Sequence, residues 1–293
     1  MLTIKSEARG LIAHGVSFCA GCGLELAGRI ILDVLGSNTV IVIPPGCAAL
    51  FSGCGNETVT KIAGFQGNLE NTAAYASGIK AGFEMQGRGD IQVLGLAGDG
   101  ATVDIGLQSL SGALERGDRI LYICYDNEGY MNTGIQSSGS TPLSAWTTTT
   151  PGGKPVYRKD MVGIVAAHKI PYTATASVGY VEDFRKKVKK AQAATADGPA
   201  YIHVQVPCPP GWGSEPEQSI EVAKLAVQSL CWPLYEIVDG EEYKMTVRVA
   251  HPKPVVDYLR LQKRFAGMDE KKIDELQAAV EKEYAHLMKK MSQ

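Results

Sequence analysis

Short β-rich runs alternate with helical segments along most of the chain, and this alternation constrains the fold more than any other feature. The expected strands cover residues 39–43, 91–96, 120–125, 172–176 and 200–206. Apolar residues recur every three or four positions in the segments around them, which predicts helices over 23–35, 68–85, 104–115, 160–168 and 180–194. Strands that alternate with helices are typical of a parallel sheet covered on both faces. The sequence therefore predicts an α/β fold with a doubly wound, mostly parallel sheet.

The end of the chain has a different pattern. Residues 268–291 are highly charged, with apolar residues at the spacing of one helix face. This predicts an amphipathic helix that packs on the domain or on a partner. We therefore expect one catalytic domain over 1–230 and a C-terminal helical extension over 231–293.

Composition and charge exclude several classes of protein. The 293 residues are 45% hydrophobic, enough for a large core, and the net charge of -2 offers no excess of positive charge for nucleic acid or an anionic membrane. No window approaches the roughly 18 consecutive apolar residues of a membrane span, and residues 1–18 lack the pattern of a signal peptide. We expect a soluble cytoplasmic protein. Seven cysteines in that compartment indicate metal or redox chemistry rather than disulfides.

Residues that can bind cofactors follow the predicted strands. Cys47 follows the first strand, Gly98-Asp99-Gly100 the second, Asn127 the third and Cys208 the last. Ligands in open α/β sheets bind outside the carboxyl ends of the strands. We expect these residues to meet at one edge of the sheet.

Gly98-Asp99-Gly100 and Asn127 suggest a site for a phosphate and a cation. Glycines on both sides of a carboxylate let backbone N–H groups approach a phosphate while the carboxylate meets a metal ion. Asn127 comes 28 residues after Asp99 and could supply a second oxygen to a Mg²⁺ ion that bridges a diphosphate. Asp-Gly is also a common turn dipeptide, so the glycine motif alone would be a weak signal.

The cysteines suggest a metal centre. Cys19 and Cys22 form a CxxC pair, and Cys47 and Cys208 would complete four thiolates, the number that a four-iron cluster requires. A tetrahedral zinc site is the alternative, although structural zinc sites are usually built from two close pairs. Cys54 is near enough to Cys47 in the sequence to be a substitute ligand. Cys124 and Cys231 have no place in the pattern, and Cys124 fits a buried strand.

The chain resembles the β subunit of pyruvate:ferredoxin oxidoreductase and its relatives, the 2-oxoacid:ferredoxin oxidoreductases. The resemblance covers residues from about 10 to 265. It is carried by the GDG motif at 98–100, DIG at 104–106, SGALERG at 111–117 and ICYDNEGYMNTGIQ at 123–136. GDG followed after about 25 residues by an asparagine is the thiamine-diphosphate signature. The resemblance implies the thiamine-diphosphate-binding fold.

The resemblance also implies roles for individual residues. Asp99 and Asn127 would ligate Mg²⁺ through their side chains and Gly129 through its carbonyl, with Gly98 and Gly100 at the diphosphate. Asn132 would face the substrate carboxylate or the thiamine adduct, whereas Glu128 and Tyr130 would be turn and packing residues. His14 precedes the CxxC pair where the family usually carries a histidine, so it would lie near the cluster or the diphosphate, with an ordinary structural histidine as the alternative.

All four cysteine positions match the family pattern for a 4Fe4S cluster. The family holds this cluster with a CxxC pair, a cysteine about 28 residues after the first, and one in a late PCPxGW-like segment. Here these are Cys19, Cys22, Cys47 and Cys208, the last within PCPPGW. This combination is highly specific.

The expected activity is the thiamine-dependent oxidative decarboxylation of a 2-oxoacid, with single electrons passing through the cluster to ferredoxin. The resemblance implies coenzyme A as acyl acceptor, an α subunit that supplies the activating glutamate, and further γ and δ subunits. Pyruvate is the leading substrate. Residues 137–142 lack the basic residue that relatives usually carry there. Because such a residue can pair with a carboxylate or phosphate, its absence puts the substrate identity and the contact with coenzyme A in question. Branched-chain 2-oxoacids, 2-oxoglutarate and oxalate, which needs no coenzyme A, are the alternatives.

Two other functions remain open at this point. One is a thiamine-dependent decarboxylase or synthase without electron transfer, in which the cysteines are incidental. The other is a zinc-stabilised assembly subunit with a degenerate cofactor site.

Overall fold

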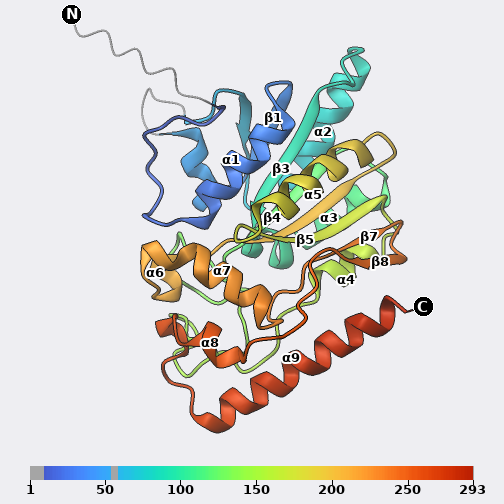
Figure 1. The fold of residues 1–293 in the computed structure, drawn as a ribbon. Helices are drawn as coiled ribbons and strands as arrows, with labels where there is room; N and C mark the ends of the chain where they lie inside the picture. The colour runs from blue at the N-terminus through green and yellow to red at the C-terminus, as the bar shows by residue number, and fades with distance from the viewer. Residues whose placement is uncertain (1–9, 54–58, 293) are drawn as a thin grey trace, which may run out of the picture.

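A single mixed β-sheet organises the protein in the computed structural model, which describes residues 10–53 and 59–292 (Figure 1). The eight strands lie in the order β2-β1-β3-β4-β6-β5-β7-β8; pairing is parallel from β2 to β5, and β7 and β8 are antiparallel to their neighbours. The strands are β1 (Thr39–Ile43), β2 (Ala63–Gln66), β3 (Gln92–Gly98), β4 (Leu121–Asp126), β5 (Tyr172–Ser177), β6 (Ala200–Gln205), β7 (Tyr235–Val238) and β8 (Glu242–Met245). The expectation of a mostly parallel α/β sheet is confirmed.

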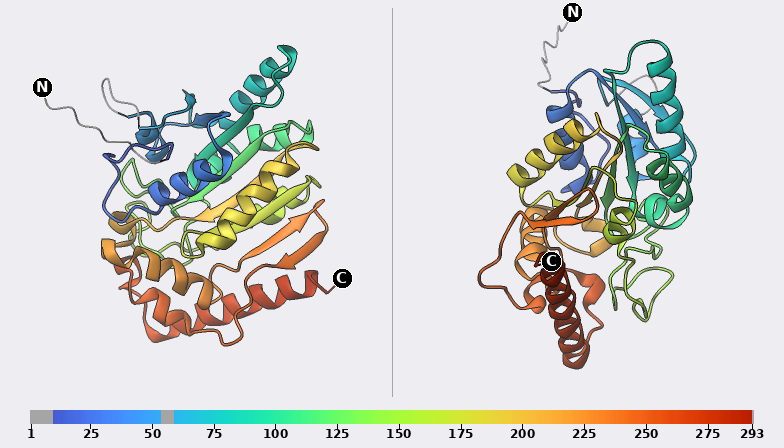
Figure 2. Two further views of the ribbon diagram at one scale, coloured as in Figure 1. Left: turned by 45° about the horizontal axis from the view of Figure 1, so that its top comes forward. Right: turned by 90° about the vertical axis from the view of Figure 1, so that its right-hand side faces the viewer.

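Helices cover both faces of this sheet (Figure 2). One face packs against α1 and α5, and the opposite face packs against α2, α3 and α4, with a separate apolar core on each side. The helices are α1 (Gly23–Leu35), α2 (Thr72–Met85), α3 (Leu107–Glu115), α4 (Met161–Ala166), α5 (Val181–Ala194), α6 (Pro209–Trp212), α7 (Ser219–Gln228), α8 (Val255–Leu259) and α9 (Glu270–Lys290). The sheet is therefore doubly wound.

All five predicted strands and all six predicted helices are present, with shifted ends. The helix expected from 104 begins only at Leu107, because Gly100–Asp104 forms a π-helical turn first. π-helical turns are rare in proteins, and those that occur are often found at functional sites. The helix expected from 68 begins at Thr72. The first shift directly follows the GDG motif, where the chain turns away from the sheet.

The C-terminal part of the chain combines strands and helices. β7 and β8 form a hairpin that continues the sheet beyond β5, while α6 to α9 share a third apolar core around Trp212, Trp232 and Phe265. The expected amphipathic helix is α9, whose apolar side buries Leu276 and Val280. The division at residue 230 stays a prediction. No helix in the described part of the chain is both long and apolar enough to cross a bilayer.

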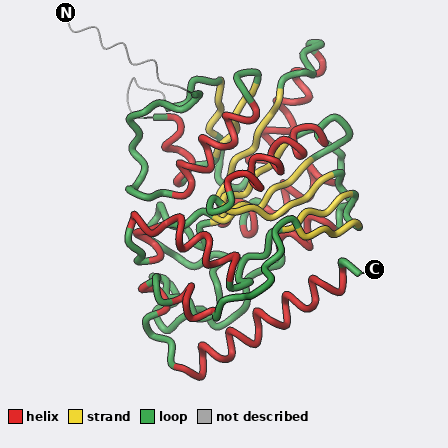
Figure 3. The backbone as a smooth tube through the Cα atoms, viewed as in Figure 1, coloured by secondary structure: helices red, strands yellow, loops and turns green. Residues whose placement is uncertain are grey.

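The carboxyl ends of the central strands lie together, which places the residues that follow them. Gly98 at the end of β3 pairs with Tyr125 near the end of β4, and Asp126 pairs with Gln205 at the end of β6. Between β4 and α4 the chain runs as loop and turn, visible as a long stretch without helix or strand (Figure 3). The GDG motif, Asn127 and Cys208 thus leave the sheet at one edge.

Candidate functional site

The side-chain amide of Asn127 reaches two oxygen atoms at this edge. One of its polar atoms lies 3.0 Å from Asp99 Oδ1 and 2.9 Å from the Gly129 carbonyl oxygen. As a nitrogen this atom donates to both oxygens, and as an oxygen it requires a cation among the three. Octahedral Mg²⁺ holds its ligands at about 2.1 Å, so neighbouring ligands lie about 3.0 Å apart. The three residues therefore fit three adjacent positions around one Mg²⁺ ion.

The orientation of the Asn127 amide is linked to what occupies the site. With its oxygen toward Asp99, the amide turns its nitrogen toward the sulfur of Cys47 at 3.9 Å. The opposite orientation would let the nitrogen donate to both Asp99 and the Gly129 carbonyl. The first orientation suits a cation beside a thiolate, and the second suits a site without a cation.

Asp99 is held in a buried, negatively charged setting. Its side chain accepts a hydrogen bond from Ser138 Oγ at 2.5 Å, and only 1% of the residue is exposed. Burial raises the pKa of Asp99 well above its ordinary value, the charges of Asp126 and Glu128 act in the same direction, and the Ser138 hydrogen bond opposes them. A bound cation would reverse this balance because it favours the carboxylate. Ser138 belongs to the uncharged segment whose sequence gave no sign of this contact.

Gly100 is required by close packing. A Cβ atom there would lie 2.3 Å from the ring of Tyr130. The Tyr130 hydroxyl donates to the Gly100 carbonyl at 3.2 Å and also lies 3.2 Å from Asp104 Oδ2, so the ring is fixed in place. Gly98 has slightly more space around it, since a Cβ atom added there would lie 3.1 Å from the Tyr125 ring. Tyr130 is thus a packing residue, as expected, and it closes the GDG turn.

The four cysteines of the predicted cluster site come from three separate segments. Cys22 precedes α1, Cys47 begins a 3₁₀ helix (Cys47–Ser52) after β1, and Cys208 precedes α6. Cys19 is exposed and the other three are partly buried. In every pair among the four, the charge of one thiolate raises the pKa of the other, which shows that all four face a common region.

Backbone contacts hold these segments together. Gly23 N donates to the Pro207 carbonyl at 3.0 Å, so the CxxC loop is joined to the PCPPGW segment. Ser219 Oγ donates to the Gly21 carbonyl at 2.7 Å, which fixes the middle of the loop. The hydroxyl of Tyr125, at the end of β4, accepts from Ala48 N at 3.0 Å and anchors the Cys47 turn.

Burial keeps the thiols protonated in the metal-free chain, and a bound metal would displace these protons. Burial raises the pKa of Cys47 to about 11 and that of Cys208 to about 12, and the neighbouring thiols add to both effects. Backbone N–H groups point at the sulfurs and oppose the shift: those of Leu24 and Glu25 at Cys22, Asn132 at Cys47 and Gly211 at Cys208. N–H groups that donate to sulfur are typical of iron–sulfur sites, where they tune the reduction potential.

The spacing of the thiols bears on the kind of metal. Within the described residues, no three His, Cys, Asp or Glu side chains are arranged to hold one metal ion. The sulfurs around a single zinc, each about 2.3 Å from it, would lie within about 4 Å of one another. A four-iron cluster instead binds each thiolate through a different iron and so needs a wider set. The four cysteines are not grouped as a single-ion site in the described part of the chain.

The remaining sequence candidates lie around this edge or outside it. Asn132 is exposed in the loop after β4, and its backbone N–H is the group directed at Cys47. His14 is exposed in the segment before the CxxC loop, and its role stays a prediction. Cys54 lies outside the described residues. Cys124 is fully buried in β4, and Cys231 is in the C-terminal part next to Arg158.

Sequence reasoning missed the contacts that hold Glu128. The Glu128 carboxylate is buried and pairs with Arg264 at 2.5 Å, a residue 136 positions away. Trp212, from the PCPPGW segment, donates from its indole nitrogen to the Asn127 carbonyl at 2.7 Å. His203 Nε2 lies 2.7 Å from Asp126 Oδ2 and ties that end of the turn to β6.

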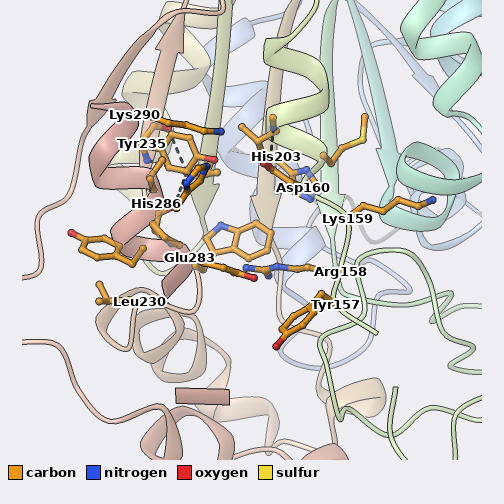
Figure 4. A pocket seen from close by; sticks show the side chains of 18 of the residues that line it. Tyr157, Arg158, Lys159, Asp160, His203, Leu230, Tyr235, Glu283, His286 and Lys290 are labelled. Carbon is orange, nitrogen blue, oxygen red and sulfur yellow. Dashed lines mark hydrogen bonds between the residues drawn. The ribbon is translucent and has the colours of Figure 1, made fainter. Parts of the chain in front are cut away.

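A cavity of about 480 Å³ lies between α9 and the β7–β8 hairpin, and none of the four cysteines of the predicted cluster site lines it (Figure 4). Aromatic residues of the hairpin and charged residues of α9 line it, and Asp126 and His203 form its inner wall. We call it the α9 cavity. The cofactor-type residues are thus at the sheet edge, and the α9 cavity reaches the back of the Asn127 turn.

Comparison with known proteins identifies the family. Residues 45–204 match the family of thiamine pyrophosphate enzymes at their C-terminal TPP binding domain. Over 283 residues the chain is 48% identical to the pyruvate synthase subunit PorB of Methanothermobacter marburgensis. The aligned region covers 95% of this chain and 97% of that protein. The chain belongs to the β subunits of the 2-oxoacid:ferredoxin oxidoreductases. It is also 45% identical over 300 residues to the ketoisovalerate oxidoreductase subunit VorB of Pyrococcus abyssi, covering 98% of this chain and 95% of that one.

A solved structure of the same class shares the fold of this β subunit. The 2-oxoglutarate:ferredoxin oxidoreductase from Magnetococcus marinus, determined with 2-oxoglutarate, coenzyme A and succinyl-CoA, matches with a TM-score of 0.59 and 18% sequence identity. The match covers 93% of this chain and 97% of that one. The β subunit is therefore part of an oxidoreductase that uses thiamine diphosphate.

Proposed function

We propose that this β subunit binds thiamine diphosphate through Mg²⁺ at Asp99, Asn127 and Gly129, and holds a 4Fe4S cluster on Cys19, Cys22, Cys47 and Cys208. In this role it oxidises a 2-oxoacid and passes electrons to ferredoxin. The observation that carries the proposal is the position of the Asn127 side-chain amide, one end of which lies against Asp99 and the Gly129 carbonyl while the other end lies against Cys47. One residue thus joins the two cofactor sites.

Thiamine diphosphate supplies the carbon nucleophile for decarboxylation of a 2-oxoacid, and an iron–sulfur cluster accepts electrons one at a time. The chain's own contribution is position. Asp99 and Asn127 would hold the cation at the diphosphate. Gly100 lets the turn pack against the Tyr130 ring, because it has no side chain. Asn132 is exposed beside Cys47, where it can orient the substrate.

Pyruvate is the proposed substrate. It is supported by the 48% identity to a pyruvate synthase subunit, while the 45% identity to a ketoisovalerate oxidoreductase subunit keeps branched-chain 2-oxoacids as the next candidates. The missing basic residue in 137–142 has a partial substitute, because Lys154 is buried and donates to the Ser138 carbonyl at 2.7 Å. That lysine is engaged with the backbone, so oxalate without coenzyme A remains an alternative.

The proposed β subunit works only in a complex. In this family the glutamate that activates thiamine diphosphate comes from the α subunit, and further γ and δ subunits and ferredoxin complete the electron path. We place the complex in the cytoplasm, with coenzyme A as the usual acyl acceptor. The isolated chain is expected to be inactive, and turnover by the pure chain would contradict this assignment.

The deciding experiment is anaerobic reduction of a low-potential dye by the co-purified complex. Pyruvate, a branched-chain 2-oxoacid, 2-oxoglutarate and oxalate are compared, each with and without coenzyme A. Activity on pyruvate that requires coenzyme A supports the proposal as stated, whereas activity on oxalate without coenzyme A replaces the substrate. A complex that decarboxylates without reducing the dye and contains no iron is instead a non-redox thiamine enzyme, and one that binds zinc but no thiamine is an assembly subunit.

A further inference from the structure

Glu128 is a buried acid in the turn that presents Asn127 and Gly129. Its side chain is 1% exposed and its backbone has a φ of +64°, in the left-handed region. A non-glycine residue in this region is strained and persists where its surroundings fix it. Its backbone N–H donates to Asp126 Oδ1 at 2.8 Å and its carbonyl accepts from Thr141 Oγ1 at 2.8 Å. Hydrogen bonds therefore hold both the backbone N–H and the backbone carbonyl of Glu128, beside the proposed cation site.

Arg264 fixes the Glu128 carboxylate from the C-terminal part of the chain. Its Nη2 lies 2.5 Å from Glu128 Oε2, and the guanidinium also donates to Gln262 Oε1 at 2.7 and 3.0 Å. The guanidinium carbon lies 4.0 Å above the centre of the Trp212 ring, and Trp212 itself donates to the Asn127 carbonyl. Arg264 thus reaches the Asn127 turn by two routes, and we call Glu128, Arg264 and Trp212 the Glu128 clamp.

A second guanidinium approaches from the α9 cavity. Arg158 Nη1 lies 3.7 Å from Glu128 Oε1, and its Nη2 donates to the Cys231 carbonyl at 2.8 Å. Figure 4 shows Arg158 with its charged end facing Glu283 of α9. Because Arg158 is shared with Glu283 and stands farther from Glu128, Arg264 is the main partner of the carboxylate.

We propose that Arg264 is a positioning residue for the Mg²⁺ site: through the Glu128 clamp it fixes the backbone of residues 127–129, so that the Asn127 side chain and the Gly129 carbonyl face Asp99. The inference rests on the proposed Mg²⁺ and thiamine diphosphate site. A guanidinium is always charged and planar, so it fixes both the position and the angle of a carboxylate. Groups that orient the ligands of a metal typically change its affinity when they are removed.

The test compares Mg²⁺ binding in complexes that carry Arg264→Met, Arg264→Lys, Glu128→Gln or no substitution. Wild type and variants are titrated with Mg²⁺ at saturating thiamine diphosphate, followed by tryptophan fluorescence and calorimetry. We expect Arg264→Met to raise the half-saturating Mg²⁺ concentration by about 10- to 100-fold, and Glu128→Gln to raise it similarly. Arg264→Lys should bind Mg²⁺ more tightly than Arg264→Met but more weakly than wild type, because lysine keeps the positive charge and lacks the planar, paired N–H donors of arginine. The matched control is Lys263→Met, the exposed neighbour in the same turn, which should bind Mg²⁺ like wild type.

The outcomes separate positioning from simple stability. The melting temperature without Mg²⁺ is measured for every variant, and the double variant Glu128→Gln with Arg264→Met removes both charges, so that no unpaired buried charge remains. Variants that melt lower yet bind Mg²⁺ as wild type does would overturn the inference. A wild-type complex that binds neither Mg²⁺ nor thiamine diphosphate would overturn the proposed function and this inference together.

Discussion

The side-chain amide of Asn127 lies 3.9 Å from the sulfur of Cys47, so a residue of the proposed cation site contacts a residue of the proposed cluster site. The strand order produces this contact, because β1 and β4 lie on either side of β3 and both end at the same edge. If the chain holds the proposed cofactors, this contact links the charge on the cluster to the residue beside Asp99.

Asn127→Asp tests this contact. An aspartate keeps an oxygen for the cation, but it removes the N–H donor and adds a negative charge beside the thiolate. Both changes disfavour the reduced cluster, which carries one more negative charge. One hydrogen bond of about 1 kcal/mol corresponds to about 40 mV for a one-electron couple, so the midpoint potential should fall by at least that amount.

The measurement is a redox titration of the anaerobic complex, followed by electron paramagnetic resonance. Asn132→Ala is the control, because Asn132 points its backbone N–H, not its side chain, at Cys47. It should leave the potential unchanged. A potential that does not move in Asn127→Asp, with full iron content, would show that the contact is not a hydrogen bond.

Replacing single cysteines should separate ligands from bystanders. Cys47→Ser and Cys208→Ser should lose most of the iron, because a four-iron cluster needs four thiolates. Cys231→Ser is the matched control, since Cys231 is also partly buried and lies apart from the other thiols. Iron and acid-labile sulfide are assayed in anaerobically purified complexes. Full iron in Cys208→Ser would point to another fourth ligand.

Asp99 should make the metal-free protein sensitive to pH. Its folded-state pKa is raised, chiefly by burial, so the folded protein keeps a proton that the unfolded chain has lost. The free energy of unfolding therefore falls as pH rises from the ordinary carboxyl pKa of about 3.9 toward the raised value, by up to about 1.4 kcal/mol per pH unit.

Asp99→Asn removes this titration. With a chelator present, the variant should lose less stability than wild type as pH rises, which thermal melting at several pH values would show. In wild type, the apparent affinity for Mg²⁺ should rise over the same window, because the metal displaces the proton. Parallel melting curves for the two proteins would contradict the assignment of Asp99 as the titrating group.

Gly100→Ala should damage the diphosphate turn by packing alone. The added methyl would meet the Tyr130 ring, which two polar contacts hold in place. The overpacked site should lose about 1–3 kcal/mol of stability and bind thiamine diphosphate more weakly.

The control for this substitution is Gly78→Ala on the exposed side of α2, where the new methyl meets open space. It should stabilise the protein by about 0.5–1 kcal/mol, because alanine favours a helix interior over glycine. Denaturant melts measure both changes. Equal stability in the two variants would mean that the Tyr130 ring moves aside freely.

The sequence could predict that cofactor-type residues meet, because each follows a strand and parallel strands end at one edge. Asp99, Asn127, Cys47 and Cys208 all obey this rule. Helix and strand periodicity also located the five central strands. These signals are local, or they follow from one topological rule.

Other features had no such signal. β2 has no alternation, since all four of its residues are exposed, and the β7–β8 hairpin is short, although its Asp239-Gly240 turn is a recognisable hairpin dipeptide. The pairing of Glu128 with Arg264 depends on the packing of the C-terminal part, so no local pattern could reveal it. The same holds for Ser138, an ordinary loop serine until Asp99 is placed beside it.

The cysteine positions have a consequence for how the protein is made. Cys208 must join three cysteines that precede it by more than 160 positions, and Arg264 comes later still. Contacts between such distant residues form only after the loops between them have closed, which is slow. At the proposed four-cysteine site, a nascent chain of the first 200 residues still lacks one of the four ligands. The complete ligand set therefore exists only after Cys208 has been synthesised and the long loops before it have closed.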